Sequence, residues 1–260
     1  MRNDFDIAAV KYDETFTFSN IGKAQRLRVF KYVNPIINTK KKLNILELNC
    51  GTGEDAIHFS KLGHNVIATD ISEGMIAVAN SKKQSSHLLF KVQDITTINA
   101  TTFNQKFDIV FSNFGGLNCI SKIQLEAFCK VAKSLLNTNG KLVMVIMPKK
   151  SIWERFYFLI KGDLKKSKRR NTNESIDVNV DGVNVKTWYY NPKEVISLST
   201  NDFTMNRVKP IGLAIPPSYL ENSILSKRPL LPIFKGIDAI LTASFFAKYA
   251  DHFLIELTKK

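Results

Sequence analysis

The sequence predicts an α/β fold in which a mostly parallel sheet carries helices on both faces. Short apolar runs have the length of buried strands, and most segments between them have the 3.6-residue periodicity of helices. Because this alternation requires crossover connections, we expect parallel strands covered on both sides. The five strands expected first along the chain are residues 43–48, 65–69, 88–92, 108–112 and 141–147.

One more helix precedes the fifth strand, and the alternation breaks after Pro148. This helix covers 121–136, with Asn139-Gly140 as its stop. Period-two apolar residues around Asp181-Gly182 predict an inserted β-hairpin with a primed turn. Asn191-Pro192-Lys193-Glu194 offers an N-cap, a first-turn proline and a capping-box acid, so another helix begins there. Two more strands are expected, within 203–215 and at 252–257.

Length and composition indicate a globular protein. At 260 residues and 44% hydrophobic, the chain can bury a core as one domain or as a domain with an inserted cap. Its apolar runs are shorter than the roughly 18 residues of a spanning helix, and its charged amino terminus lacks a signal-peptide core. We therefore expect a soluble, cytoplasmic protein. Three cysteines without C-x-x-C spacing, and histidines without metal-like spacing, predict neither a disulfide nor a metal site.

Basic residues are concentrated in one segment. The formal net charge of +14 is compatible with nucleic acid, an anionic membrane surface or an acidic substrate. Residues 161–170, KGDLKKSKRR, contain six basic residues and follow the apolar and aromatic run SIWERFYFLI. This segment is either a peripheral contact with anionic lipid or nucleic acid, or a solvated loop.

Two glycines and an acid mark the expected ligand site. In an open α/β sheet, ligands bind at the carboxyl ends of strands where the strand order reverses. Gly51 and Gly53 follow the first strand and let a ligand approach main-chain N–H groups at a helix start. Asp70 ends the second strand 19 positions after Gly51, where a carboxylate can accept hydrogen bonds from ribose hydroxyls. These residues predict a nucleoside site.

The residues around the glycines bear on whether that nucleoside carries phosphates. Residues 51–56, GTGEDA, satisfy the dinucleotide pattern G-x-G-x-x-A. Glu54 and Asp55, however, put two negative charges at the helix start where a pyrophosphate would lie. Glu47, four residues before Gly51, suits a ligand with a cationic amine and no phosphate.

The stretch ILELNCGTGEDAIHFSKLGHNVIATDIS, residues 45–72, resembles the first two motifs of class I S-adenosylmethionine-dependent methyltransferases, usually E/D-x-G-x-G-x-G and an acid. Asn49 stands in place of the first glycine, and asparagine tolerates unusual backbone angles better than most residues. The resemblance covers roughly residues 5–149. It implies a Rossmann-like fold with a mostly parallel seven-stranded sheet, and S-adenosylmethionine as the cofactor.

The same resemblance implies a set of cofactor-binding residues. In FKVQDI, residues 90–95, it places Asp94 at the adenine amino group and Ile95 along the ring. In FDIVFSNFGGLNCI, residues 107–120, it places Asn113 and Phe114 beside the sulfonium. The whole expected set is Tyr12, Arg26, Glu47, Asn49, Gly51, Thr52, Gly53, Asp70, Ile71, Met75, Asp94, Ile95, Asn113 and Phe114.

The first part of the chain, residues 5–29, resembles the lid helix of relatives that include the ubiquinone and menaquinone C-methyltransferases. By this resemblance Tyr12 covers the cofactor. Arg26 pairs with the cofactor carboxylate, because a guanidinium fork suits two carboxylate oxygens. A structural salt bridge is the alternative role for Arg26.

The resemblance suggests a division of the chain. Residues 1–149 are expected to form the S-adenosylmethionine-binding core with its lid. Residues 150–260 are expected to complete the sheet and to carry a hairpin at about 175–190 and an apolar, helical cap at about 216–250. Nine aromatic residues beyond 149 suggest an apolar acceptor pocket, although core packing also uses such residues: Trp153, Phe156, Tyr157, Trp188, Tyr189, Tyr219, Phe234, Phe245 and Phe246.

The expected activity is methyl transfer to a small, lipophilic or aromatic acceptor. Such a displacement depends chiefly on positioning and desolvation, so a base is optional. His252 is a weak candidate for it, because a histidine that opens a strand is often structural. The alternatives are an RNA methyltransferase that docks through the basic segment, and a non-catalytic or NAD-dependent nucleotide-binding protein. The sequence gives no indication of an oligomeric state.

Overall fold

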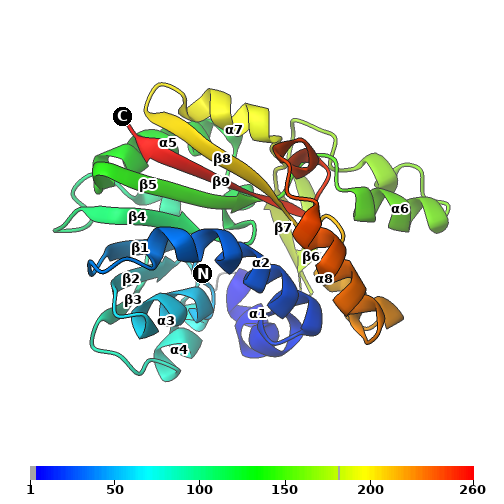
Figure 1. The fold of residues 1–260 in the computed structure, drawn as a ribbon, viewed down its shortest axis with the longest axis horizontal. Helices are drawn as coiled ribbons and strands as arrows, with labels where there is room; N and C mark the ends of the chain where they lie inside the picture. The colour runs from blue at the N-terminus through cyan, green and yellow to red at the C-terminus, as the bar shows by residue number, and fades with distance from the viewer. Residues whose placement is uncertain (1–3, 181) are drawn as a thin grey trace.

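A seven-stranded sheet forms the centre of the molecule (Figure 1). The computed structural model describes residues 4–180 and 182–260. The strand order is β3-β2-β1-β4-β5-β9-β8, in which β9 runs antiparallel to both of its neighbours and the other pairs are parallel. This mostly parallel sheet confirms the predicted fold class. The strands are β1 (Asn44–Leu48), β2 (Asn65–Asp70), β3 (Leu88–Val92), β4 (Phe107–Ser112), β5 (Leu136–Ile146), β8 (Phe203–Ile211) and β9 (His252–Lys259).

Two buried clusters lie on opposite faces of the sheet. Successive residues of one strand face opposite sides, and Leu46 and Leu48 of β1 accordingly belong to one cluster whereas Ile45 belongs to the other. The first cluster packs against α5 (Lys122–Leu135) and α7 (Pro192–Ser199). The second cluster packs against three helices, α2 (Asn20–Ile37), α3 (Glu54–Lys61) and α4 (Glu73–Ser81).

The topology places the site at one edge of the sheet. Strand β1 lies between β2 and β4, so the connections leave it in opposite directions and a crevice forms at the carboxyl ends of these strands. Because β9 is antiparallel, its first residues stand at that same edge. Residues far apart in the sequence, from the loop after β1 to the start of β9, therefore meet there.

Two details of the strand prediction differ from the structure. Helix α5 ends at Leu135 and β5 begins at once, at Leu136, whereas the sequence predicts a stop at Asn139-Gly140 and a strand from residue 141. The buried Leu136 pairs with Phe107, and the register then shifts before Ile109. Asn139, with a φ of 61°, bends the strand within its length instead of ending the helix.

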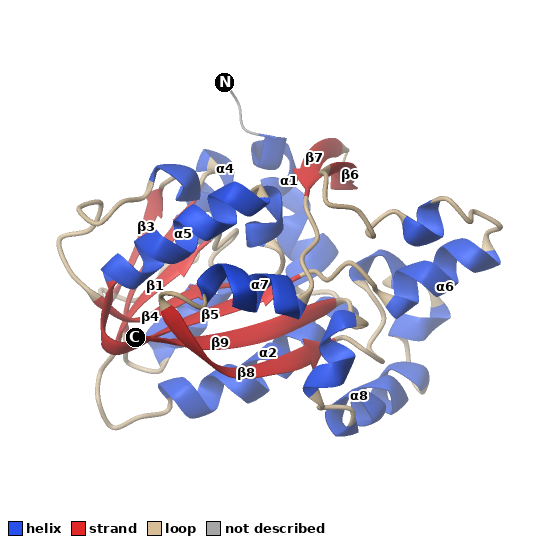
Figure 2. Cartoon of the chain, turned by 90° about the horizontal axis from the view of Figure 1, so that it is seen from above, coloured by secondary structure: helices blue, strands red, loops and turns tan. Residues whose placement is uncertain are grey.

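The inserted hairpin has the predicted form. Strands β6 (Ile176–Val180) and β7 (Val183–Thr187) pair as an antiparallel two-stranded sheet. Gly182 has a φ of 92°, whereas Asp181, the other residue of the predicted turn, lies outside the described residues. The hairpin contacts the first helix, α1 (Asp4–Tyr12), and Figure 2 shows the two side by side.

The lid is two helices where the sequence predicts one. Helix α1 continues into a π-helical turn, Asp13–Thr17, and α2 starts anew after Ser19. The Ser19 side chain caps α2 by accepting a hydrogen bond from the Gly22 N–H at 2.9 Å. A Cβ on Gly22 would lie 1.9 Å from the Phe16 carbonyl oxygen, so the tight turn depends on this glycine.

The remaining helices form one end of the molecule. Helices α6 (Ile152–Ile160) and α8 (Leu230–Ile240) lie together at the end away from β3 (Figures 1 and 2). The Trp153 and Phe234 rings meet edge to face between them. In the described parts of the chain, no helix combines the length and hydropathy needed to cross a bilayer.

Candidate active site

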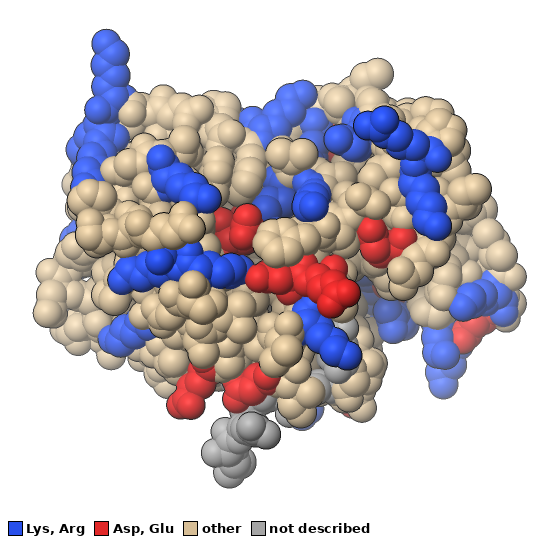
Figure 3. Space-filling view, turned by 90° about the horizontal axis from the view of Figure 1, so that it is seen from below, with Lys and Arg blue, Asp and Glu red and all other residues tan. Residues whose placement is uncertain are grey.

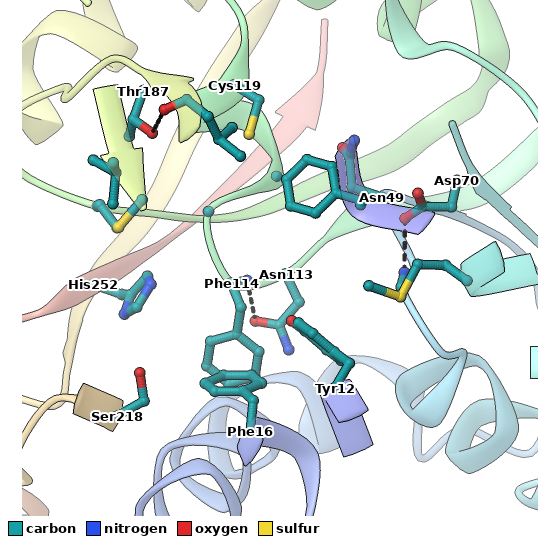
Figure 4. A pocket seen from close by; sticks show the side chains of 18 of the residues that line it. Tyr12, Phe16, Asn49, Asp70, Asn113, Phe114, Cys119, Thr187, Ser218 and His252 are labelled. Carbon is teal, nitrogen blue, oxygen red and sulfur yellow. Dashed lines mark hydrogen bonds between the residues drawn. The ribbon is translucent and has the colours of Figure 1, made fainter. Parts of the chain in front are cut away.

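A cavity of about 1180 Å³ opens at the carboxyl edge of β1, β2 and β4. Of the fourteen residues predicted to bind the cofactor, all but Gly53 line it, and so does His252. Figure 4 shows Phe114 and Phe16 in the middle of the cavity, between Tyr12 and Asp70 on one side and His252 and Ser218 on the other. We refer to these two parts as the nucleoside half and the acceptor half.

The glycine loop has the conformation that its residues suggest. Asn49, Gly51 and Gly53 all have positive φ angles, 54°, 54° and 80°. Gly53 lies beneath the loop, where a Cβ would be 2.5 Å from the Phe90 ring, so it supports the site without lining it. Asn49 adopts the left-handed conformation of the glycine that it replaces.

The Asn49 side chain is accommodated by a second glycine. A Cβ on Gly116, in the loop after β4, would lie 2.3 Å from Asn49 Cβ and 2.6 Å from its Cγ. Asn49 Oδ1 also accepts a hydrogen bond from Ser112 Oγ at 3.3 Å. The departure from the usual glycine motif is therefore compensated across the crevice between β1 and β4.

Asp70 holds the glycine loop in place. Its Oδ2 accepts a hydrogen bond from the Gly51 N–H at 2.8 Å, and its Oδ1 accepts one from the Ser72 N–H at 3.0 Å. Burial raises the pKa of this carboxyl, against the effect of these hydrogen bonds. The carboxylate oxygens keep acceptor sites for a ligand because each oxygen can accept two hydrogen bonds.

A buried network joins the lid to the loop after β4. Arg26 Nε lies 2.9 Å from Asp55 Oδ1, and Asn113 Nδ2 donates to Asp55 Oδ2 at 2.8 Å. The structural salt bridge considered for Arg26 is thus present. One guanidinium nitrogen, Nη1, is buried without a hydrogen-bond partner in the described structure.

Glu47 is the second group without a partner. It is buried at the end of β1, and its Oε2 has no hydrogen-bond partner among the described residues. Burial, with a smaller contribution from the Asp55 carboxylate, raises the pKa of Glu47 well above its ordinary value. An unpartnered carboxyl and an unpartnered guanidinium nitrogen in one cavity fit the ammonium and carboxylate of an amino acid.

The lid closes over the glycine loop through side-chain contacts. Asp13 accepts a hydrogen bond from Thr52 Oγ1 and forms an ion pair with Lys82, the residue that follows α4. Tyr12 packs on Phe16, and Phe16 meets Phe114 edge to face with ring centroids 5.1 Å apart. Burial raises the pKa of Tyr12 to about 12, so its hydroxyl stays neutral.

The remaining predicted residues surround the far end of the nucleoside half. Asp94 Oδ1 caps the turn after β3 by accepting from the Thr96 N–H at 2.8 Å, and Asp94 also faces the cavity. Ile95, half-exposed Ile71 and buried Met75 line the same region. These apolar side chains can hold a flat ring beside one carboxylate.

A buried ion cluster, which the sequence did not predict, lies in the acceptor half. Arg170 Nε is 2.8 Å from Glu154 Oε2, and its Nη2 is 3.3 Å from Asp251 Oδ1. Arg169 makes two hydrogen bonds to Glu154 as well. Arg170, Glu154 and Asp251 are all buried. The prediction that the whole run 161–170 is a solvated or lipid-facing loop is therefore wrong for Arg169 and Arg170, because their charges neutralise buried acids.

His252 adjoins this cluster. Its Nδ1 is buried, makes no hydrogen bond among the described residues, and lies 3.3 Å from Asp251 Oδ2. That oxygen accepts a hydrogen bond from Gln25 Nε2 at 3.2 Å. The imidazole meets the Phe114 ring edge to face. With Nδ1 directed at Asp251, Nε2 is the nitrogen that can meet a ligand. The sequence could have indicated this contact, because Asp251 directly precedes His252 in the segment YADHF.

The predicted aromatic pocket is mostly wrong. Among its nine aromatic residues, only Tyr189 and Tyr219 line the cavity. Phe156 and Phe245 are exposed on the surface, and Trp188 packs against the core. The cavity lining also includes the apolar residues Ile120, Met147, Val178 and Val185, together with the ion cluster. The described residues contain no grouping of His, Cys, Asp or Glu that suits a metal ion.

The sheet order, the glycine loop and the acid after β2 define a nucleoside site of the class I methyltransferase type. Comparison with known proteins supports the same type of site. Residues 45–140 match a family model described as a methyltransferase domain. A malonyl-[acyl-carrier protein] O-methyltransferase from Bacillus anthracis is 28% identical over 132 residues, covering 49% of this chain and 47% of the relative. A demethylmenaquinone methyltransferase from Paenarthrobacter aurescens is 28% identical over 59% of this chain and 58% of its own length.

Solved structures share the fold over a longer part of the chain. A Pyrococcus horikoshii protein has a TM-score of 0.59 at 18% identity and covers 96% of this chain and 99% of its own. Magnesium protoporphyrin IX methyltransferase from Synechocystis, solved with bound S-adenosylhomocysteine, has a TM-score of 0.56 at 15% identity, covering 92% and 87%. Residues 45–140 thus match a methyltransferase domain, within a fold that solved S-adenosylmethionine-dependent methyltransferases share, as the motifs predict. The chain spans about half the length of the curated relatives that it matches.

Proposed function

We propose that the protein transfers a methyl group from S-adenosylmethionine to a small-molecule acceptor bound in the acceptor half of the cavity. The observation that carries this proposal is the pair of unpartnered buried groups, Glu47 Oε2 and Arg26 Nη1, beside the glycine loop. They suit the ammonium and the carboxylate of the cofactor's methionine moiety. Asp70 would hold the ribose hydroxyls, and Asp94 with Ile95 would hold the adenine.

The cofactor supplies an electrophilic methyl group on a sulfonium. The protein's contribution is to bind and align the reactants and to exclude water from them. Phe114, Phe16 and Tyr12 surround the junction of the two halves, and the lid closes it. Residues before 149 thus hold the cofactor, and the region from 150 onward adds most of the acceptor half, which supports the proposed division of the chain.

The acceptor half favours a largely apolar molecule with one polar group. Its aliphatic and aromatic walls suit such a body, and the walls reach Asp251 and His252 at one side. Curated relatives act, by their names, on malonyl-[acyl-carrier protein] and on demethylmenaquinone. A lipophilic acceptor that carries a hydroxyl group fits these walls and this polar side.

His252 is the proposed general base. With Nδ1 oriented by Asp251, its Nε2 can take the proton of an acceptor hydroxyl as the oxygen attacks the methyl group. We expect His252→Asn to lower the turnover of such an acceptor by about 10²- to 10⁴-fold, with unchanged affinity for S-adenosylhomocysteine. Calorimetric titration and steady-state rates measure the two effects separately.

The alternative functions have less support. Glu54 and Asp55 both line the cavity at the start of α3, so a dinucleotide's pyrophosphate would meet negative charge there. Arg26 pairs with Asp55 and leaves Glu54 unbalanced. Titrating the protein with S-adenosylhomocysteine and with NAD tests this directly. Binding of NAD alone would overturn the proposed function.

We expect Asp70→Ala to weaken S-adenosylhomocysteine binding about ten- to a hundredfold. The change removes the charge-assisted hydrogen bonds to the ribose, for a total loss of about 1.5 to 3 kcal/mol. It also frees the Gly51 N–H, so thermal unfolding must be measured on the same sample. Undiminished affinity in a folded variant would show that Asp70 does not contact the ligand.

Cofactor binding should release a proton from Glu47. In the free protein its raised pKa keeps the carboxyl protonated up to an unusually high pH, whereas an ammonium partner requires the carboxylate. Affinity for S-adenosylhomocysteine should therefore rise with pH, by at most about tenfold per pH unit, until the pH passes that raised pKa. Calorimetry in two buffers of different ionisation enthalpy measures the released proton. Glu47→Gln should abolish the release, and its persistence would assign the proton to another group.

A further inference from the structure

Helices α6 and α8 together expose an unusual amount of apolar surface. On α6 the exposed residues are Ile152, Phe156, Leu159 and Ile160, which lie on one face at helical spacing. On α8 they are Ile233, Ile237 and Ile240, again on one face. Ile160 is 70% exposed and Ile240 is 80% exposed. Because Trp153 and Phe234 join the two helices, these faces belong to one end of the molecule.

Basic residues accompany these apolar side chains, and Figure 3 shows Lys and Arg side chains at the right-hand end of the molecule, where α6 and α8 lie. Residues 150–170 and 224–250 contain twelve basic and three acidic residues, a net charge of +9 within the +14 of the whole chain. The three acids are not free at the surface. Glu154 and Asp238 are buried and paired with arginines, and Asp163 lies 3.4 Å from Lys166. The exposed basic residues are Arg155, Lys161, Lys165, Lys166, Lys168, Lys227, Arg228 and Lys235.

We propose that this end of the molecule, the α6–α8 face, docks on an anionic lipid bilayer. Exposed aliphatic side chains enter the boundary between headgroups and acyl chains, while lysines and arginines beside them meet anionic headgroups. Aliphatic side chains do not stack on bases as RNA-binding aromatics do, so the composition favours lipid over nucleic acid. A second copy of the chain would bring two strongly positive faces together.

The acceptor half of the cavity adjoins this face. Tyr219 lines the cavity and packs against Tyr157 of α6, with ring centroids 5.2 Å apart, and Glu154 of α6 lines the cavity as well. A lipophilic acceptor dissolved in the bilayer would therefore reach the cavity along α6. This part of the inference rests on the proposed function, whereas the docking itself does not.

Flotation with phosphatidylcholine vesicles, with and without phosphatidylserine, tests the proposal on the full chain. We expect binding that requires phosphatidylserine and weakens as salt is added. Ile160→Asp with Ile240→Asp should reduce binding at least about tenfold. The matched control is Ile123→Asp on α5, where the isoleucine is 82% exposed but lies on another part of the surface. This control should bind like the unchanged protein.

Lysine variants distinguish vesicle binding through the α6–α8 face from binding through the net positive charge of the whole protein. Neutralising Lys161, Lys165 and Lys166 to glutamine should reduce binding about tenfold or more. The same change at the exposed Lys40, Lys41 and Lys42, before β1, alters net charge equally and should have little effect. Calorimetric titration with S-adenosylhomocysteine on every variant distinguishes failed docking from a failed cofactor site.

Several results would overturn the proposal. They are vesicle binding without a phosphatidylserine preference, equal losses in the control variants, or self-association that Ile160→Asp with Ile240→Asp abolishes. Salt-sensitive binding to RNA that exceeds binding to the vesicles would assign the α6–α8 face to nucleic acid instead.

Discussion

Replacing Arg170 by methionine should destabilise the protein by about 3 to 5 kcal/mol. The guanidinium is buried between Glu154 and Asp251 and lies over the Tyr189 ring, so its removal takes the arginine partner from buried Asp251 and leaves buried Glu154 with Arg169 alone. Burial disfavours the charged Asp251, yet His252 and Arg170 hold its pKa below the ordinary value. Urea unfolding at neutral pH measures the loss.

The neighbouring Lys168 provides the control for this variant. Lys168 is exposed, and Lys168→Met should change the free energy of unfolding by no more than about 0.5 kcal/mol. Equal effects of the two substitutions would show that Arg170 is solvated in solution. The comparison also tests the correction to the basic segment, because the two residues are equivalent in the sequence pattern.

A second large effect is expected at Gly116. Gly116→Ala places a Cβ 2.3 Å from Asn49 Cβ, and the three nearest atoms all belong to the Asn49 side chain. We expect a loss of about 1 to 3 kcal/mol from this overpacking, together with weaker binding of S-adenosylhomocysteine. The glycine loop must shift to relieve the contact.

Asn49→Gly is the matched rescue. It removes all three atoms that the new methyl group meets, and glycine also tolerates the positive φ at position 49. The double variant should therefore recover most of the stability and affinity lost in Gly116→Ala. Additive losses in the double variant would show that the two residues are independent.

The sequence predicted the nucleoside half well because local patterns determine it. The strand, the glycines, the helix start and Asp70 follow one another within about thirty residues, so their spacing fixes their arrangement. Fold class followed from the same alternation of strands and helices. Asn49 was recognised as a departure, but its compensation by Gly116 depends on a contact across two strands that no local pattern reveals.

The acceptor half was poorly predicted because distant segments build it. Glu154, Arg170 and Asp251 are separated by up to 97 positions. They meet because the start of α6 bonds to Tyr249, just before β9, and because Arg170 pairs with both acids. A run of six basic residues gave no sign that its last two turn inward. The predicted aromatic pocket was wrong for a related reason. Composition does not distinguish an exposed helix face from a cavity wall.

The antiparallel last strand has a consequence for how the enzyme folds. Strand β9 lies between β5 and β8, so β8 cannot join the sheet until β9 has paired with β5, more than a hundred residues earlier in the chain. Closing so long a loop is entropically costly and slow. The same event carries Asp251 and His252 to the cavity. Strands and loops before residue 115 supply most of the nucleoside half, whereas the acceptor half is complete only when β9 has joined the sheet.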